Sequence, residues 1–382
     1  MALPATSARP RGVPARSVLI HVVRAAALRR INTAVLLLLL GAGCAARTSR
    51  PDIVTTSAAR NDALARARVW TETPTASLDV RRGPRGDGAF APGALVECTR
   101  VDRDMSGSTP KFTCRLPGGR DVKVKYGRDN GEVYAEVAAS RILWALGFTA
   151  DAMYPVRVRC HGCEGGTPDG DARLFDPATI ERKVRGRTLA DDGGEGWSWP
   201  ELDTLAPTGA LSTRAQRDAL KLLAAMLQHT DSKREQQQLV CEADSWSTSG
   251  CRRPIAYISD LGKTFGKVNL MNRDTPGSVN LDAWLEAPVW NGTTGCRANA
   301  GMTFTGTLKD PEISEEGRQL LARLLQRLSD AQLRDVFDVA RFPVRAAATG
   351  HESETVERWV AAFRKKAAEI ASRRCDVTRA ER

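Results

Sequence analysis

The sequence predicts an α+β fold, in which a strand-rich part with one helix precedes a larger helical part. Short runs of apolar and β-branched residues, separated by turn-forming residues, occupy much of residues 92–189. Longer runs with helical periodicity dominate residues 190–382. A chain of 382 residues is long enough for one large domain with two lobes. We therefore expect an N-lobe at 92–189 and a C-lobe at 190–382.

Five strands are expected in the first part. The breaks DRDMSGSTP and PGGR, between the first three, have the turn chemistry of antiparallel hairpins. The expected strands are Ala94–Val101, Lys111–Leu116, Val122–Tyr126, Tyr154–Cys160 and Thr179–Val184. One helix, Val133–Leu146, follows the third strand, and Gly147 is expected to end it.

The second part is mostly helical. Thr213 is a suitable N-cap for a helix that runs to Gln228. Ser329 and Gln332 have the spacing of a capping box. Two short strands and three further helices complete the prediction, at Gln238–Cys241, Ile255–Ser259, Ser314–Leu328, Asp330–Arg341 and Glu352–Arg374.

Residues 1–43 have the features of a signal peptide. The apolar run Thr33–Gly43 follows two arginines and ends in small residues before Cys44. The run is well short of the ~20 residues that a membrane-spanning helix needs. The segment Gly41–Cys44 resembles a bacterial lipobox, which implies a lipid anchor on Cys44, and simple signal cleavage is the alternative. We expect export, with the protein anchored in the cell envelope at the outer membrane or periplasm, or else secreted.

Residues 44–91 are rich in Ala, Arg, Thr, Pro and Gly, which predicts a flexible tether, although a short helix around 61–70 is an alternative. The formal net charge of +11 includes six arginines in 1–43, a segment without acidic residues. Elsewhere basic and acidic residues alternate, so a basic face for nucleic acid is not expected.

Eight cysteines remain besides Cys44, an even number that suits disulfides in an oxidising compartment. Six of them lie in local pairs: Cys98 with Cys114, Cys160 with Cys163, and Cys241 with Cys251. Cys296 and Cys375 are left to join distant segments, although eight cysteines allow 105 pairings and spacing alone does not select one. A metal or redox motif is the alternative for CHGC at 160–163, but zinc needs four ligands.

Phosphoryl transfer needs a cation on the phosphates, oxygen ligands for a metal, and a carboxylate that orients the attacking hydroxyl. The segment HTDSKREQQ, at 229–237, follows a predicted helix and precedes a short strand. DLGKTFG, at 260–266, follows the next strand. Upstream, DVKVKYG at 121–127 supplies a strand lysine before a helix that carries Glu132 and Glu136. Alone, each motif is typical of a polar loop or of a solvated helix face.

In this order the motifs resemble the catalytic loop, the DFG element and the strand lysine of protein kinases. The segments KYG, at 125–127, and EVAASRILWALGF, at 136–148, resemble atypical bacterial kinase-like proteins, related to HipA-type and phosphatidylinositol kinases. The resemblance covers about residues 94–341 and implies a two-lobed protein-kinase-like fold that binds ATP and Mg²⁺.

The resemblance implies a role for each motif residue. Asp231 would be the catalytic base, and Lys233 would neutralise the transferring phosphate. Gln236 and Asp260 would be metal ligands. The remaining implied contacts are with the nucleotide: Lys125 would bind its phosphates and pair with Glu136, and Glu181, in the segment between the lobes, would lie at the adenine. Side chains alternate between the two faces of a strand, so Lys123 and Lys125 point to the same side. Lys123 is therefore an alternative to Lys125.

The sequence departs from the kinase pattern where Gln236 replaces the expected Asn, and ATP is scarce outside the cytoplasm. Three functions stay open. In the first, the chain is an exported phosphoryl or nucleotidyl transferase that acts on an unknown envelope or extracellular acceptor, either a protein or a lipid. Alternatively, it is a catalytically silent kinase-like scaffold of the envelope. The third reading is a disulfide-stapled lipoprotein that binds an envelope partner.

Overall fold

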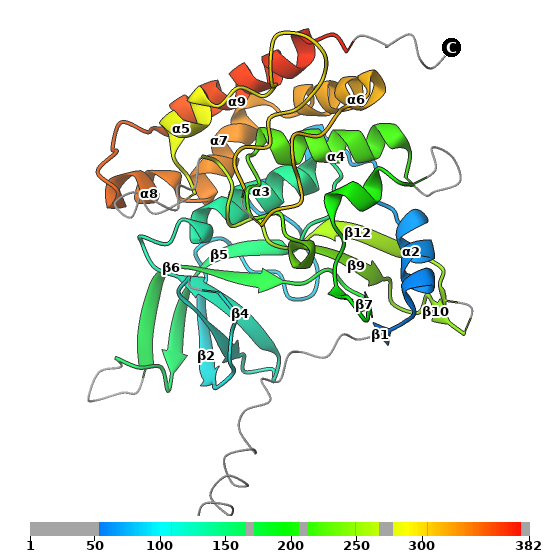
Figure 1. Ribbon diagram of the computed structural model, residues 1–382. Coiled ribbons are helices and arrows are strands. Elements are labelled where there is room, and N and C mark those ends of the chain that lie inside the picture. Colours follow the sequence, from blue (N-terminus) through cyan, green and yellow to red (C-terminus); the bar gives the residue numbers. More distant parts are fainter. Residues whose placement is uncertain are drawn as a thin grey trace, which may run out of the picture. The chain divides into compact units, whose positions relative to one another are not determined.

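The computed structural model describes residues 53–107, 109–165, 172–205, 212–248, 250–266, 278–303 and 305–375, all within one compact unit. The predicted signal peptide and Cys44 lie outside the described residues. Figure 1 shows a mixed α and β architecture in which most helices are gathered on one side of the strands. The mixed fold class is confirmed, and the division into two lobes stays a prediction.

Five strands close into a barrel in the order β2-β3-β4-β6-β5. They are β2 (Leu95–Val101), β3 (Lys111–Arg115), β4 (Asp121–Tyr126), β5 (Ala152–His161) and β6 (Ala172–Arg182). The hairpin pairings β2-β3 and β3-β4 are antiparallel, as the turn residues predicted. The sequence did not predict the closure, which comes from a parallel pairing of β2 with β5 that places Cys98 opposite Cys160.

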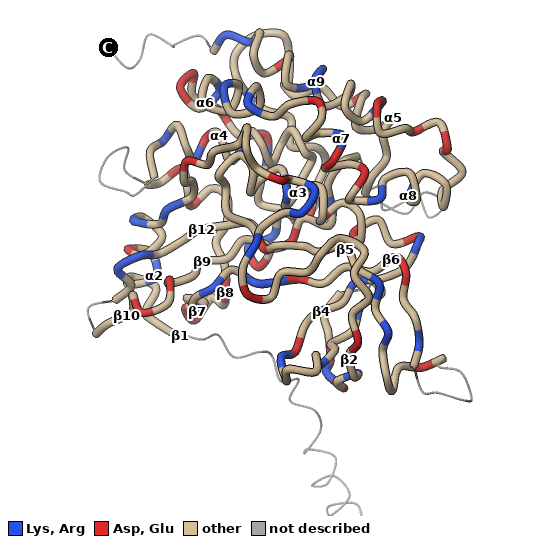
Figure 2. Tube along the Cα trace, turned by 180° about the vertical axis from the view of Figure 1, so that it is seen from behind, with Lys and Arg blue, Asp and Glu red and all other residues tan. Residues whose placement is uncertain are grey.

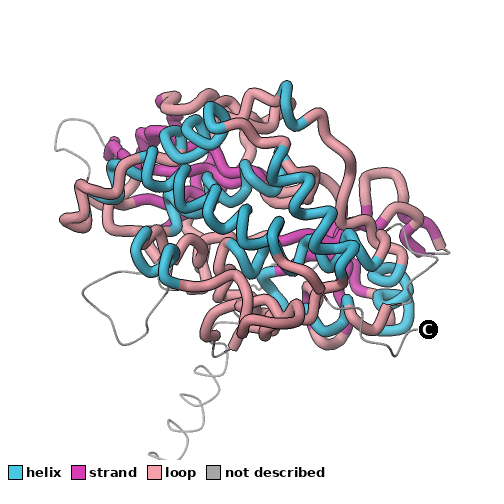
Figure 3. The backbone as a smooth tube through the Cα atoms, turned by 90° about the horizontal axis from the view of Figure 1, so that it is seen from above, coloured by secondary structure: helices cyan, strands magenta, loops and turns pink. Residues whose placement is uncertain are grey.

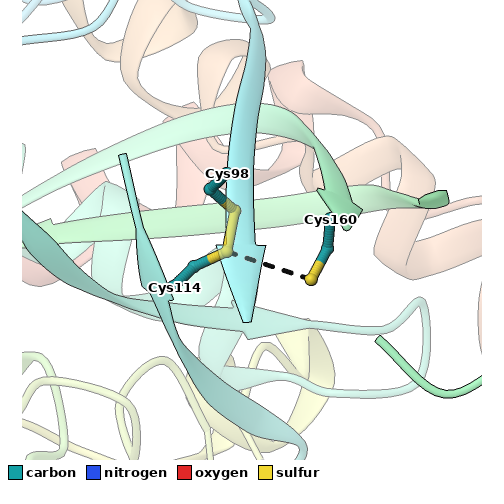
Figure 4. Close-up of side chains that lie close together, drawn as sticks. All are labelled: Cys98, Cys114 and Cys160. Atoms are coloured by element: carbon teal, nitrogen blue, oxygen red, sulfur yellow. Dashed lines mark hydrogen bonds between the residues drawn. A yellow bond between two sulfur atoms is a disulfide. The ribbon is translucent and has the colours of Figure 1, made fainter. Parts of the chain in front are cut away.

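The barrel interior is apolar and contains two disulfides. Cys98 bonds to Cys114 across β2 and β3, and Cys160 bonds to Cys163 at the end of β5. Figure 4 shows that the first disulfide lies beside Cys160, with 3.9 Å between the sulfurs of Cys114 and Cys160. These four cysteines are at most 6% exposed, so the two disulfides fill the core of a small barrel.

Helix α3 (Glu132–Ala145) packs against β5 and also against α7, a helix of the C-terminal part. All its residues except Trp144 are buried, including Glu132, Glu136 and Arg141. A solvated charged face was an alternative for this helix, and the structure contradicts it. The helix ends as predicted at Gly147, whose φ of 89° suits glycine and whose Cβ would lie 2.1 Å from a backbone oxygen.

A second sheet has the order β1-β7-β9-β12, with β8 beside β7. Its strands are β1 (Ile53–Val54), β7 (Arg187–Asp191), β8 (Gly194–Glu195), β9 (Gln237–Cys241) and β12 (Pro254–Ile258), and a separate short hairpin pairs β10 (Trp246–Ser247) with β11 (Gly250–Cys251). In the antiparallel pair β9-β12, β9 follows the predicted catalytic loop and β12 precedes the DLG motif. This pairing brings the two motifs together.

Residues 53–91 differ from the expected tether. Strand β1 pairs with β7, and α2 (Ser57–Ala65) contributes Ala63 and Leu64 to the main core. The short turn η1 (Thr75–Ser77) lies between core residues Val69 and Val80. Few apolar residues recur here with a regular period, so their burial depends on partners far away in the sequence and was not predicted.

The C-terminal helices are α4 (Arg214–Met226), α5 (Leu281–Glu286), α6 (Glu315–Gln326), α7 (Asp330–Val339), α8 (Phe342–Ala348) and α9 (Val356–Ser372). Figure 3 shows several of them side by side above the strands. The caps Thr213 and Ser329 are confirmed, each closing a capping box. Helices α4, α6, α7 and α9 match four predicted helices within a few residues, while α5 and α8 were not predicted.

All four expected cysteine pairs are disulfides, which include Cys241–Cys251 and the longer link Cys296–Cys375. They are consistent with an exported protein. Within the described residues, no helix combines the length and apolar character that crossing a membrane requires. Figure 2 shows basic and acidic residues interspersed over the described elements, as the sequence predicted.

Candidate functional site

The buried Lys125 of β4 lies at the centre of an ionic cluster. Its Nζ is 2.5 Å from Glu136 Oε1 and 2.8 Å from Glu132 Oε2, both on α3. It is also 3.7 Å from Asp260 Oδ1, in the DLG motif. The Lys125 side chain is 2% exposed. The structure therefore joins the strand lysine, the helix glutamate and the DLG aspartate, which lie up to 135 residues apart in the sequence.

Burial and charge act in opposite directions on this cluster. Burial alone would lower the pKa of Lys125, but the carboxylates of Glu136, Asp260 and Glu132 outweigh it and raise that pKa well above its usual range. Burial raises the pKa of Glu136, and Lys125 offsets only part of this. For Asp260, the attraction of Lys125 outweighs burial and lowers the pKa. Lys125 and Asp260 are thus both charged at neutral pH.

The DLG segment is shaped to meet Glu132. Asp260 Oδ1 accepts a hydrogen bond of 3.0 Å from the backbone N–H of Gly262. A Cβ on Gly262 would lie 2.7 Å from Glu132 Cγ, which is closer than ordinary packing allows. Lys263 then reaches Glu132 Oε1 at 3.2 Å. The glycine is required for close approach, and the lysine after it is a site residue that the sequence analysis did not single out.

Backbone hydrogen bonds hold the predicted catalytic loop against the DLG segment. The N–H of Thr230 donates to Lys263 O at 3.1 Å. The N–H groups of Ser259 and Asp260 donate to Gln236 O at 2.8 and 3.3 Å. The two motifs, predicted separately, therefore form one structural unit next to Lys125.

Within this loop, Asp231 and Lys233 are about one-third exposed, and Asp231 Oδ1 lies 3.3 Å from Lys233 Nζ. The negative charge of Asp231 outweighs partial burial and raises the pKa of Lys233. Both side chains are accessible to a ligand, whereas Ser232 between them is fully buried and its Oγ accepts from Leu308 N. Their catalytic roles stay predictions.

His229 is a structural residue of the loop. It is 1% exposed, and burial lowers its pKa to about 4, so the imidazole is neutral near pH 7. Its Nε2 lies 3.2 Å from the side-chain amide of Gln237, which is also buried. Gln237 thus faces His229. The backbone oxygen of Gln236 accepts hydrogen bonds from the DLG segment and orients it. The role of the Gln236 side chain as a metal ligand stays a prediction.

The structure distinguishes Lys123 from Lys125. Lys123 forms an ion pair with Glu181 on the neighbouring strand β6, in register with it. Glu181 also lies 2.7 Å from Lys183, which in turn lies 2.9 Å from Asp151. The attraction of the two lysines outweighs burial and lowers the pKa of Glu181 to about 2. Glu181 was predicted at an adenine site, and in this state its carboxylate is occupied by these two lysines.

Asp151 completes a second network that the sequence analysis missed. Its carboxylate accepts from Val184 N at 2.8 Å and from Ser259 Oγ at 2.8 Å. The network therefore runs from the 181–184 segment to the residue directly before Asp260. No sequence motif predicts this network, because its members come from β5, β6 and β12 or from the residues next to these strands.

Comparisons with known proteins give weak likenesses. No family model and no curated protein matches the chain. The crystal structure of a Helicobacter pylori proinflammatory kinase, CtkA, is similar at 10% identity, covering 72% of this chain and 99% of that chain, with a TM-score of 0.38. The structure of an apo pseudokinase is similar at 13% identity, covering 69% and 90%, with a TM-score of 0.16. TM-scores this low do not establish a shared fold.

Proposed function

We propose that the chain is a kinase-like phosphotransferase that uses Mg-ATP to phosphorylate an acceptor in the cell envelope. One observation carries the proposal: Lys125, Glu136 and Asp260 form one ionic cluster, although their motifs are remote in sequence. Lys125 Nζ lies 2.5 Å from Glu136 Oε1 and 3.7 Å from Asp260 Oδ1. The catalytic loop that carries Asp231 is hydrogen-bonded to the Asp260 segment. Phosphoryl transfer depends mainly on positioning and charge, which these groups supply.

In this proposal each side chain has one task. Lys125, held by Glu136, neutralises phosphate oxygens of the nucleotide. Asp231 accepts the hydrogen bond of the acceptor hydroxyl at a carboxylate oxygen and orients it for attack. Lys233, 3.3 Å from Asp231, balances charge on the transferring group.

The carboxylates fit the metal that such a reaction requires. Oxygen atoms of Glu136 and Asp260 lie within 4.8 Å of each other, and oxygen ligands suit Mg²⁺. Among the described residues, none donates a hydrogen bond to the buried Oε2 of Glu136, so either a proton or a cation would satisfy it. Asp260, which is 32% exposed, would hold the ion. When bound, Mg²⁺ would neutralise charge on the phosphates.

The test is transfer of labelled phosphate from Mg-ATP to envelope extract by the purified, oxidised protein. Asp231→Asn keeps the shape of the side chain and removes its charge, so transfer should fall by about 100-fold or more. Asp62→Asn is the matched control, because Asp62 is exposed on α2 and pairs only locally with Arg66. Equal transfer by wild type and Asp231→Asn would refute the proposal.

A catalytically silent scaffold is the second candidate. The Gln at position 236 favours it, because the longer side chain displaces a metal-binding oxygen by one methylene. The occupied carboxylate of Glu181 favours it as well. A melting temperature that does not respond to millimolar Mg-ATP would support the scaffold, whereas stabilisation by ATP would support the enzyme.

A further inference from the structure

Glu132 sits in a ring of donors that would suit a phosphate group equally well. Its Oε2 receives hydrogen bonds from Lys125 Nζ at 2.8 Å and Thr109 Oγ1 at 3.1 Å, and its Oε1 lies 3.2 Å from Lys263 Nζ. These donors come from β4, the β2–β3 loop and the segment after Asp260. Ammonium and hydroxyl groups that converge on one carboxylate also bind a phosphate oxygen, which carries the same charge and accepts the same bonds.

A third lysine lies next to this ring. Lys111 of β3 is the direct cross-strand neighbour of Lys125, an arrangement of like charges that destabilises a sheet. Among the described residues, Lys111 has a hydrogen bond of 3.4 Å to Thr109 and no ion pair. Burial and the nearby Lys125 lower the pKa of Lys111. An anionic ligand that contacts both lysines would relieve this repulsion.

We propose that Lys111, Lys125 and Lys263 form a binding site for a polyphosphate chain, and that Glu132 occupies the place of one phosphate until the ligand displaces it. This inference rests on the proposed function for Lys125, and it adds Lys111, Lys263 and the exchange with Glu132. Three lysines from three segments match a chain of linked phosphates better than a single anion.

The ligand is either a nucleoside triphosphate or free inorganic tripolyphosphate. The two share the triphosphate chemistry, and they differ in the base. Beside Lys125 on the same face of β4 stands the ion pair of Lys123 with Glu181, where a base would need an apolar surface. We therefore expect the phosphates to supply most of the affinity.

Isothermal titration calorimetry tests this with the purified, oxidised protein. The probes are ATP and inorganic tripolyphosphate, each with and without Mg²⁺. Lys111→Gln and Lys263→Gln should each weaken the binding of both probes by about threefold to tenfold, and Glu132→Gln should tighten it by a similar factor. Lys365→Gln is the control, because Lys365 is exposed on α9. The affinity of this variant for both probes should equal that of wild type.

Each outcome of the titrations supports or refutes the polyphosphate site. Equal affinity for both probes would support recognition of the phosphates alone, and tighter ATP binding would support a nucleotide. If the folded wild type binds neither probe, or if Lys111→Gln and Lys263→Gln bind as wild type does, the proposal is wrong. Weaker binding by Glu132→Gln would make Glu132 a metal ligand or positioning residue and would refute the displacement.

Labelled-phosphate transfer with the same samples separates this inference from the proposed function. Binding that depends on the lysines without transfer would leave the polyphosphate site intact and refute the enzyme. Transfer at wild-type rate and affinity by both lysine variants would leave the enzyme intact and refute the site.

Discussion

The two sides of the site are built differently. On the lysine side, Lys125, Glu132 and Glu136 are at most 9% exposed and are joined by short contacts between β4 and α3. On the loop side, Asp231 and Lys233 are about one-third exposed, and their pairing is local. The buried side chains of His229 and Ser232 hold the loop against the core.

The difference separates positioning from reactivity. A buried ion pair costs free energy if one partner is removed, because the other charge stays out of water. Removing one partner of an exposed ion pair costs little free energy, because water replaces the missing partner. We therefore expect substitutions on the lysine side to change both stability and binding, and substitutions of Asp231 or Lys233 to change chemistry alone.

The largest effect is expected for Lys125→Met. It leaves Glu136 buried without its cation, which should lower the free energy of unfolding by about 3–5 kcal/mol. Lys123→Met is the matched control on the same strand face, where Glu181 keeps Lys183 as a partner, and it should cost about 1 kcal/mol or less. Urea unfolding followed by tryptophan fluorescence measures both. Equal costs would remove the distinction between the two lysines.

Acid should destabilise the loop side through His229. Its pKa is about 4 in the folded protein and about 6.5 in the unfolded chain, so the unfolded state binds the proton more tightly. The contribution is complete above pH 6.5 and declines as the pH falls towards 4, by about 3 kcal/mol in total. Unfolding of wild type and His229→Gln between pH 7 and 4 measures it. Parallel curves for the two proteins would contradict the expectation.

Gly262→Ala tests the contact between the two sides. The added methyl group would lie 2.7 Å from Glu132 Cγ, so the variant should lose about 1–3 kcal/mol of stability through overpacking. Glu132→Ala removes Cγ and Cδ, the two nearest obstructing atoms, and the double variant should recover part of the loss in a double-mutant cycle. Additive costs would indicate that the glycine is needed for another reason.

The smallest effect on stability is expected for Asp231→Asn. The side chain is about one-third exposed and pairs within its own loop, so the free energy of unfolding should change by less than about 0.5 kcal/mol. A larger loss in urea unfolding would mean that the loop side is as tightly built as the lysine side. The transfer assay measures its chemical role separately.

Much of this architecture could be predicted from the sequence. Strands β2 to β5, helix α3 and the caps Thr213 and Ser329 depend on local periodicity and local hydrogen bonds. Short spacing suggested three of the disulfide pairs without selecting them, and the structure contains these three and the pair of the two remaining cysteines. The motif order indicated Lys125, Glu136, Asp231 and Asp260 as candidates, because their residue types and spacing suit one chemistry.

Only the tertiary structure decided which lysine of β4 joins the cluster. Lys123 and Lys125 share one face of a strand, and the position of α3 over that face gives Lys125 its glutamates. The packing of residues 53–91 into the core, the closure of β2 onto β5, and the convergence of Glu132, Lys111 and Lys263 were likewise decided there. Each depends on contacts between residues far apart in the chain, which local periodicity and propensity do not encode.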